Sequence, residues 1–286
     1  MFEGLKRKSK TEKAIYIITS FIFMLVALSY MYILVWTFIS GTKTHREIVM
    51  DPFGLPEVWN FKNYIEVFSK LKVNDTGFLG MLFNSVFFSV IGVGLTQFCS
   101  ITFAYCTMKY QYPGSQFIYP LFIVIMTLPL YGTGGGQYLL YDKLGWINSY
   151  AQIIPAYNAM GAGTLYFMAY YSNVSNAYME AAQIDGANNF QTYFRVMFPL
   201  AKPIFGALYL KSWIAEWNSY ESTLIYLPKK PTLPVGIYQF NQEMIYTAQL
   251  DVLFAACIIV VIPALVLFIA FNKTLTTNVS LGGLKG

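Results

Sequence analysis

The chain has 286 residues, of which 56% are hydrophobic and only 12% are charged, and its formal net charge is +5 at pH 7. Soluble domains contain roughly 25% charged residues. A soluble domain this apolar would expose large hydrophobic patches, so the composition excludes that class and indicates an integral membrane protein.

Five apolar segments have the length and composition of membrane-spanning helices, each of which needs about 20 mostly apolar residues, and a sixth apolar segment, residues 117–131, is shorter. The predicted spans are residues 14–37, 79–108, 117–131, 151–171, 204–225 and 252–271. The third is interrupted by the glycine-rich residues 132–136, and we expect it to continue at residues 137–141 as a broken or tilted helix. The predicted fold is all-α, with a six-helix membrane domain over residues 14–273.

The orientation of the spans follows from the basic N-terminal flank, residues 1–13. It carries five basic side chains, which are Lys6, Arg7, Lys8, Lys10 and Lys13. By the positive-inside rule this flank is cytoplasmic, and six spans then return the tail, residues 274–286, to the same side.

Two long loops lie on the outside in this topology, residues 40–78 and 227–250. The first contains an aromatic stretch at residues 61–68 that we expect to form a short helix at the membrane interface. In the second, the prolines between residues 228 and 234 predict that no helix forms at its start.

Residues 172–203, between the fourth and fifth predicted spans, differ in composition from the rest of the chain. Ser175 or Asn176 can cap a helix over residues 177–185, and Gly186 suits the left-handed position that ends a helix. Residues 187–198 can form a second short helix. The prediction is a helix–turn–helix on the cytoplasmic side of the membrane.

The second helix is expected to stop at Pro199 and Pro203. A compact element held at both ends by spanning helices can dock in a groove of a cytoplasmic partner and pass on its rigid-body motion. The alternative is a plain inside loop. In the docking interpretation small residues allow close approach and apolar side chains anchor the contact; these are Ala181 and Ala182, and Phe190, Phe194 and Met197.

The segment resembles the EAA motif of ABC importer permeases. The matching positions are Glu180-Ala181-Ala182, Gly186, Val196 and Phe198-Pro199, with Val196 where the family usually has isoleucine and Phe198 where it has leucine. We call residues 172–203 the EAA segment. The first outside loop is also similar to that of maltose-type carbohydrate permeases; its matching residues are Arg46-Glu47-Ile48, Asp51-Pro52, Leu55-Pro56 and Asn63-Tyr64. Together with Trp217-Asn218 and the glycine-rich ending, the resemblance covers nearly the whole chain.

The resemblance implies an assembly in the cytoplasmic membrane of a bacterium. It implies an ABC ATPase dimer that holds ATP and Mg²⁺, a second homologous permease, an extracytoplasmic sugar-binding protein, and membrane lipid around the spans. The residues it places against the ATPase are Glu180, Ala181, Ala182, Asp185, Gly186, Phe190, Val196 and Pro199. By the same analogy the loop of residues 227–250 reaches toward the binding protein's sugar cleft, and the C-terminal tail contacts the ATPase.

The chain itself lacks the G-x-x-x-x-G-K-[ST] pattern that cradles nucleotide phosphates. We therefore expect a transport subunit rather than an enzyme, with no catalytic residue, no bound cofactor or metal, and no nucleic acid partner.

The fifth predicted span contains a candidate lining for the solute pathway. Trp213, Glu216, Trp217 and Tyr220 follow an i, i+3, i+4, i+7 spacing, which places them on one helical face. Aromatic rings can stack on a sugar while a carboxylate accepts its hydroxyl hydrogen bonds. The alternative is that these residues belong to the aromatic belt at the outer interface. Asn158 in the fourth span is a weaker candidate for the lining.

Other function classes explain fewer of these features. An ion-coupled secondary transporter would usually show inverted repeats, and no second half of this chain resembles the first. A membrane enzyme would need a cluster of catalytic groups, whereas the single histidine, His45, lies in a loop. An ABC importer permease for a solute other than a sugar remains an alternative.

Overall fold

The computed structural model describes residues 9–128, 134–153, 161–247 and 249–278. Within these ranges the chain is helical apart from one two-stranded ribbon and its connecting loops, which confirms the predicted all-α class. The chain divides into two compact units. The first is Met1–Leu71 with Phe240–Val261, and the second is Lys72–Gln239 with Ile262–Gly286.

Three helices in the described part are long and apolar enough to cross a membrane, namely Thr11–Gly41, Phe78–Lys109 and Leu250–Ala270. They correspond to the first, second and sixth predicted spans. The other three predicted spans are covered by helices that are shorter or less apolar, or they extend into residues outside the described ranges, so six spans stay a prediction.

The first unit is built on helix α1 (Lys10–Gly41), which begins with a capping box between Ser9 and Glu12. The Ser9 hydroxyl accepts from the Glu12 amide, and the Glu12 carboxylate accepts from the Ser9 amide at 2.9 Å. Most apolar side chains along this helix are exposed within the single chain. Such a surface needs a cover of lipid or protein, as expected of a spanning helix.

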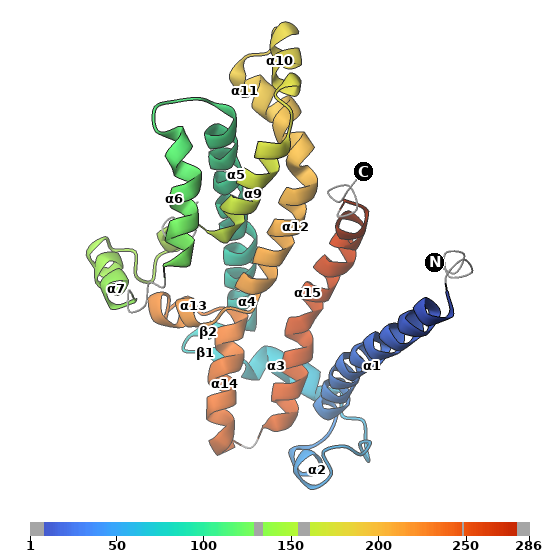
Figure 1. The fold of residues 1–286 in the computed structure, drawn as a ribbon. Coiled ribbons are helices and arrows are strands. Elements are labelled where there is room, and N and C mark those ends of the chain that lie inside the picture. The colour runs from blue at the N-terminus through green and yellow to red at the C-terminus, as the bar shows by residue number, and fades with distance from the viewer. Residues whose placement is uncertain (1–8, 129–133, 154–160, 248, 279–286) are drawn as a thin grey trace. The chain divides into compact units, whose positions relative to one another are not determined.

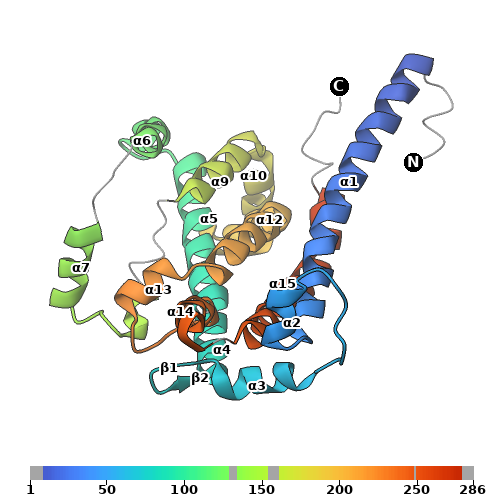
Figure 2. The same ribbon diagram turned by 90° about the horizontal axis from the view of Figure 1, so that it is seen from below.

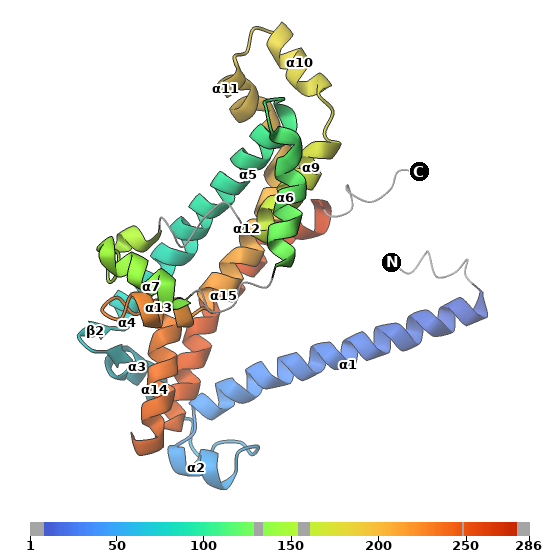
Figure 3. The ribbon, with the colours of Figure 1, turned by 60° about the vertical axis from the view of Figure 1, so that its left-hand side comes forward.

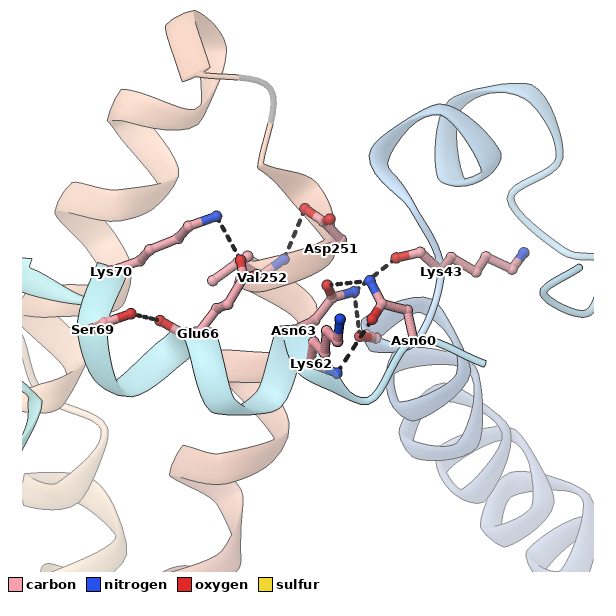
Figure 4. A network of polar contacts seen from close by, with 10 residues as sticks. Lys43, Asn60, Lys62, Asn63, Glu66, Ser69, Lys70, Asp251 and Val252 are labelled. Carbon is pink, nitrogen blue, oxygen red and sulfur yellow. Dashed lines mark hydrogen bonds and ion pairs between the residues drawn. The ribbon is translucent and has the colours of Figure 1, made fainter. Parts of the chain in front are cut away.

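The loop of residues 40–78, which is predicted to face outward, is tied to the end of α1. It contains α2 (His45–Met50) and α3 (Lys62–Lys70), so the helix predicted at residues 61–68 is confirmed. Asn63 of α3 is buried, and its amide donates to the backbone oxygens of Gly41 and Lys43 at 3.0 and 2.8 Å (Figure 4). The Tyr64 hydroxyl donates to the Phe38 oxygen at 2.9 Å. These bonds satisfy carbonyl groups that the helix end leaves free.

In the second unit a short hairpin, β1 (Lys72–Val73) and β2 (Thr76–Gly77), pairs antiparallel with Lys72 opposite Gly77. A long helix follows in three parts, α4 (Phe78–Val86), the π-helical turn η1 (Phe87–Gly92) and α5 (Val93–Lys109).

Helices α9 (Ala162–Asn173) and α12 (Phe198–Trp217) lie beside α5 in both views of the fold (Figures 1 and 2). Buried side chains from these helices form the core of this unit, and they include Ile101, Phe167, Met168, Tyr171 and Ala201.

The third predicted span appears as two helices in the described residues, α6 (Ser115–Thr127) and α7 (Gly134–Lys143). Residues 129–133, where the interruption was expected to begin, lie outside the described ranges. Helix α6 is about 20 Å long at 1.5 Å per residue, which is less than the roughly 30 Å of a bilayer core. Most of the fourth predicted span before α9 also lies outside, apart from the short turn η2 (Tyr150–Gln152).

The fifth predicted span, residues 204–225, is not one continuous helix. Helix α12 begins at Phe198 and ends at Trp217, and a separate helix, α13 (Glu221–Tyr226), follows. The Asn218 side chain donates to the Ile214 oxygen at 2.7 Å, and asparagine bonded in this way competes with the backbone hydrogen bonds that would continue the helix.

The prediction that prolines exclude a helix early in the second outside loop is wrong from Leu233 onward. Helix α14 (Leu233–Thr247) begins there, with Pro234 in its first turn. Proline is tolerated at this position because the amide it lacks would have no intrahelical partner. The Leu233 amide instead donates to the Ser85 hydroxyl at 2.8 Å. Helix α15 (Leu250–Asn278) follows and extends beyond the predicted end of the last span at residue 271.

Candidate functional site

The EAA segment forms a helix, a glycine turn and a second helix beyond the ends of α5 and α9 (Figure 3). Helix α10 (Ala177–Ile184) ends at Asp185, and Gly186 has a positive φ of 83°. The Gly186 amide donates to the Gln183 oxygen at 3.0 Å and the Ala187 amide to the Ala182 oxygen at 2.9 Å. This pair of bonds is the Schellman arrangement that closes a helix with glycine. The predicted end of the first helix is confirmed.

The second helix of the EAA segment was predicted over residues 187–198. In the structure its α-helical part is shorter, and the chain stays helical from there into α12. Helix α11 (Asn189–Thr192) begins with a capping box between Asn188 and Gln191, and the π-helical turn η3 (Tyr193–Met197) leads directly into α12. The prediction that Pro199 and Pro203 stop this helix is wrong, because both prolines lie within α12. Pro199 lies in the first turn of α12, and the wider π-helical turn before it alters the hydrogen-bond spacing at the position where proline has no amide to donate.

Exposure divides the predicted contact residues into two groups. Glu180, Ala181, Asp185, Gly186 and Phe190 are exposed, whereas Ala182 is buried and Val196 and Pro199 are half-buried. The exposed residues of α10 and the turn that follows it present an accessible surface, with Phe190 of α11 exposed to 71%.

Met197 does not belong to this surface, so its prediction as an anchor for a partner is wrong. Its side chain is fully buried in the core of the second unit with Tyr171 and Tyr193. The Tyr171 hydroxyl donates to the Met197 oxygen at 3.4 Å. Phe194 is partly exposed and its ring packs against Phe190, with 4.5 Å between the ring centroids.

Sequence reasoning missed Ile184, the most exposed large apolar side chain of the segment at 85%. It lies at the last position of α10, directly before the glycine turn. The signal in the sequence is its position: Met179 and Ala182 are three residues apart and share one helix face, whereas Ile184 lies off that face. Ile184 and Phe190 are the exposed apolar side chains on either side of Gly186.

The candidate solute lining is only partly brought together. Trp213 and Trp217 stack at 5.0 Å between ring centroids with 19° between their planes, and both are 2% exposed. Glu216 lies between them in the sequence and is half-buried. The shared helical face predicted from the spacing therefore holds for these three residues of α12.

Tyr220 is not on that face, because α12 ends at Trp217. Its ring stacks instead on Tyr238 of α14, at 4.7 Å and 16°. Asn158 lies outside the described residues.

Polar groups of α5 and α12 meet beside the tryptophan pair. The Gln97 amide donates to the Ser212 hydroxyl at 2.7 Å, and the other atom of that amide, Oε1, has no hydrogen-bond partner among the described residues. The same holds for the buried indole nitrogen Nε1 of Trp213. Buried polar atoms are usually hydrogen-bonded, so these two atoms, which have almost no accessible surface, are exceptions among the described residues.

No group of three or more His, Cys, Asp or Glu side chains with metal-site geometry occurs in the described ranges. The candidate functional features are therefore the exposed EAA segment and helix α12, which joins this segment to the buried pair Trp213 and Trp217.

Comparison with known proteins identifies the family to which the chain belongs. Residues 98–280 match the family described as binding-protein-dependent transport system inner membrane component. The chain belongs to this family. The matched range includes the EAA segment, the tryptophan pair of α12 and all of α15.

Several permeases of this family are similar to the chain over most of its length. The arabinooligosaccharides transport system permease protein AraQ of Bacillus subtilis is 27% identical, over 92% of this chain and 94% of its own. The diacetylchitobiose uptake system permease protein NgcG of Streptomyces coelicolor is 26% identical, over 87% and 82%. The trehalose/maltose transport system permease protein MalG of Thermococcus litoralis is 26% identical, over 79% and 81%.

A solved structure agrees on the fold. A chain of a bacterial ABC transporter involved in the import of the acidic polysaccharide alginate aligns with a TM-score of 0.76. It covers 93% of this chain and 98% of that chain at 21% identity, so the likeness concerns the fold. The chain is thus a membrane permease subunit of the binding-protein-dependent transport family.

Proposed function

We propose that this chain is the membrane-spanning permease subunit of an ABC importer for a sugar or oligosaccharide. The solute would arrive from an extracytoplasmic binding protein and would cross between this chain and a second, homologous permease. A separate ATPase dimer would hold ATP and Mg²⁺ and supply the driving force. The observation that carries the proposal is the exposed helix–glycine–helix of the EAA segment in a chain of this family.

The continuous helix from Asn189 to Trp217 supports a mechanical link. Helix α11, the turn η3 and helix α12 follow one another without a break, so a push on α11 is carried along the helix axis to the tryptophan pair. The π-helical turn η3 is the point where this rod can flex, since such turns interrupt regular helix geometry. ATP-driven closure of the partner would thereby rock α12 and change access to the solute pathway.

The names of similar permeases support a carbohydrate as the solute. Trp213 and Trp217 are 2% exposed and stack on each other, so a sugar can reach their faces only after α12 rearranges during transport. The half-buried Glu216 carboxylate can accept hydrogen bonds from sugar hydroxyls. The relatives are named for arabinooligosaccharides, diacetylchitobiose and trehalose or maltose, which are all carbohydrates.

The deciding experiment is mass spectrometry of the proteins that co-purify with the tagged chain from its native host in mild detergent. We expect an ABC ATPase and a second permease of similar length. A chain that purifies alone, with uptake driven by an ion gradient, would instead support a secondary transporter.

The solute class needs a second measurement on the reconstituted assembly. ATPase activity is measured in nanodiscs with the co-encoded binding protein. One set of samples contains oligosaccharides, and the other contains amino acids and peptides. Stimulation by the oligosaccharides supports the proposal. Stimulation only by amino acids or peptides would keep the importer but replace its solute.

A further inference from the structure

One ammonium group joins three helix ends at the base of the EAA segment. Lys109 is the last residue of α5, and its Nζ donates to the backbone oxygen of Val174 and to Oδ1 of Asn176, the latter at 2.9 Å. Val174 caps the C-terminus of α9, and Asn176 is the N-cap residue of α10. The three helices thus meet at a single half-buried side chain.

The chemistry of each contact suits a cation. The carbonyl groups at the end of α9 carry partial negative charge, which favours a lysine there. Hydrogen bonds from a charged donor are stronger than those between neutral groups. Lys109 therefore stabilises the end of α9 and holds the first residue of α10 in place.

The Asn176 side chain does not make the hydrogen bond that is usual for an N-cap residue. Asparagine at this position normally accepts a hydrogen bond from an amide of the first helical turn through its side chain. Here the Asn176 side chain makes no such bond, and the Ser175 hydroxyl accepts from the Ala177 amide at 3.2 Å instead. The Asn176 side-chain oxygen is thereby free to bind Lys109 without leaving the start of α10 uncapped.

The exit of the EAA segment has its own contact with α5. The Thr102 and Tyr193 hydroxyls lie 2.7 Å apart, and Tyr193 begins the turn η3 that leads into α12. The segment is therefore attached to α5 at both ends, through Lys109 where the chain enters and through Tyr193 where it leaves.

We propose that Lys109 is a positioning residue for energy coupling, which fixes the start of α10 to α5 and α9. A partner that displaces α10 then moves α5 and α9 together with α12, instead of only bending the connection at residues 174–176. This inference rests on the proposed function, because it requires a partner that pushes on the EAA segment.

The test compares variants of Lys109 and Asn176 in the complete transporter, reconstituted in proteoliposomes with its ATPase, second permease and binding protein. Lys109→Met keeps the side-chain length and removes the charge, Lys109→Arg keeps the charge, and Asn176→Ala removes the acceptor. Lys202→Met is the matched control, since Lys202 is an exposed lysine on α12. Solute uptake into proteoliposomes and ATP hydrolysis are measured for each variant.

We expect Lys109→Met to assemble normally but to import about threefold to tenfold less solute per ATP hydrolysed, the range expected when a partly exposed charged hydrogen bond is lost. Lys109→Arg should restore most of the ratio. Asn176→Ala should lower it as well, and the double variant should be no worse than Lys109→Met because both remove the same contact.

Two outcomes would overturn the inference. One is a transport-to-ATP ratio in Lys109→Met equal to that of Lys202→Met, and the other is a double variant whose losses add. Both leave the proposed function intact when the wild-type assembly couples normally. A wild-type chain that recruits no ATPase would contradict the proposed function itself.

Discussion

Gly186 shows how one residue sets the geometry of the EAA segment. Its φ of 83° lies in the left-handed region, and a Cβ added there would meet no atom within 4 Å. Backbone conformation and not crowding therefore demands glycine at this position. For other residues the left-handed conformation costs about 1–2 kcal/mol, and asparagine tolerates it best.

We predict that Gly186→Val lowers coupling between ATP hydrolysis and transport, whereas Gly186→Asn retains most of it. Both side chains enter open space, so a difference between them reports the backbone conformation. The measurement is solute uptake per ATP hydrolysed in proteoliposomes. Equal behaviour of the two variants would show that the left-handed turn does not matter for coupling.

The Glu47 carboxylate accepts hydrogen bonds from Thr44 and Glu57 and so ties together two parts of the loop of residues 40–78. The backbone amide of Thr44 lowers its pKa most, followed by the backbone amide of Glu57 and the Thr44 hydroxyl, and the charge of Lys43 contributes in the same direction. A carboxyl with a lowered pKa adds stability above its ordinary pKa, which is about 4.3, and loses it as the pH falls through the lowered value.

Glu47→Gln should therefore lower the melting temperature of the purified protein at about pH 6 and have less effect below about pH 4. Glutamine keeps the shape but accepts the amide hydrogen bonds more weakly. The check is thermal unfolding of both proteins across this pH range. A gap in melting temperature that does not narrow on acidification would show that the charge of Glu47 contributes nothing.

At the scale of single elements, the structure shows which apolar residues of the EAA segment lie on the surface and which lie in the core. The amino-acid composition of the segment does not distinguish them. Ile184 and Phe190 are exposed, whereas Met197 is fully buried. We predict that Ile184→Ser combined with Phe190→Ser reduces co-purification of the ATPase without lowering the melting temperature of the isolated chain.

In contrast to the double serine variant, Met197→Ala should destabilise the isolated chain. The expected loss in the free energy of unfolding is about 2–5 kcal/mol, the usual loss when a buried methionine is truncated. Normal ATPase recovery with the double serine variant would rule out these two side chains as part of the contact.

The helix α12 carries a second prediction, on the indole of Trp213. Its Nε1 is buried without a hydrogen-bond partner in the described ranges, so Trp213→Phe removes an N–H that stabilises nothing within them. We expect a lower melting temperature, because phenylalanine leaves space in this buried site, and slower sugar uptake per folded transporter, because the lost N–H can no longer donate to a sugar hydroxyl. Uptake equal to wild type would assign Trp213 to the packing of α12 alone.

At the scale of the whole molecule, the six-span topology makes a direct prediction about which loops face outward. Asp75 lies in the β1–β2 hairpin, in the loop predicted to face outward, and Asn188 lies in the EAA segment, which is predicted to be cytoplasmic; both side chains are exposed. With Cys99, Cys106 and Cys257 replaced by serine, a membrane-impermeant maleimide should label Asp75→Cys in intact spheroplasts. Asn188→Cys should react only after the membrane is opened. Labelling of both from outside would overturn the topology.

The sequence by itself determined the class of this protein and the place of its most specific motif. Apolar length identifies spanning helices because a bilayer imposes the same requirement on every chain. The helix–glycine–helix of the EAA segment was predictable because capping and the left-handed turn depend on neighbouring residues only.

Only the tertiary structure decided where several helices begin and end, and which of their side chains are buried against other helices. The continuation of α11 through Pro199 depends on the π-helical turn before it, and the start of α14 at Leu233 depends on a hydroxyl from Ser85. Met197 is buried because Tyr171 lies against it from another helix. Such contacts join residues that are far apart in the chain, and local composition carries no record of them.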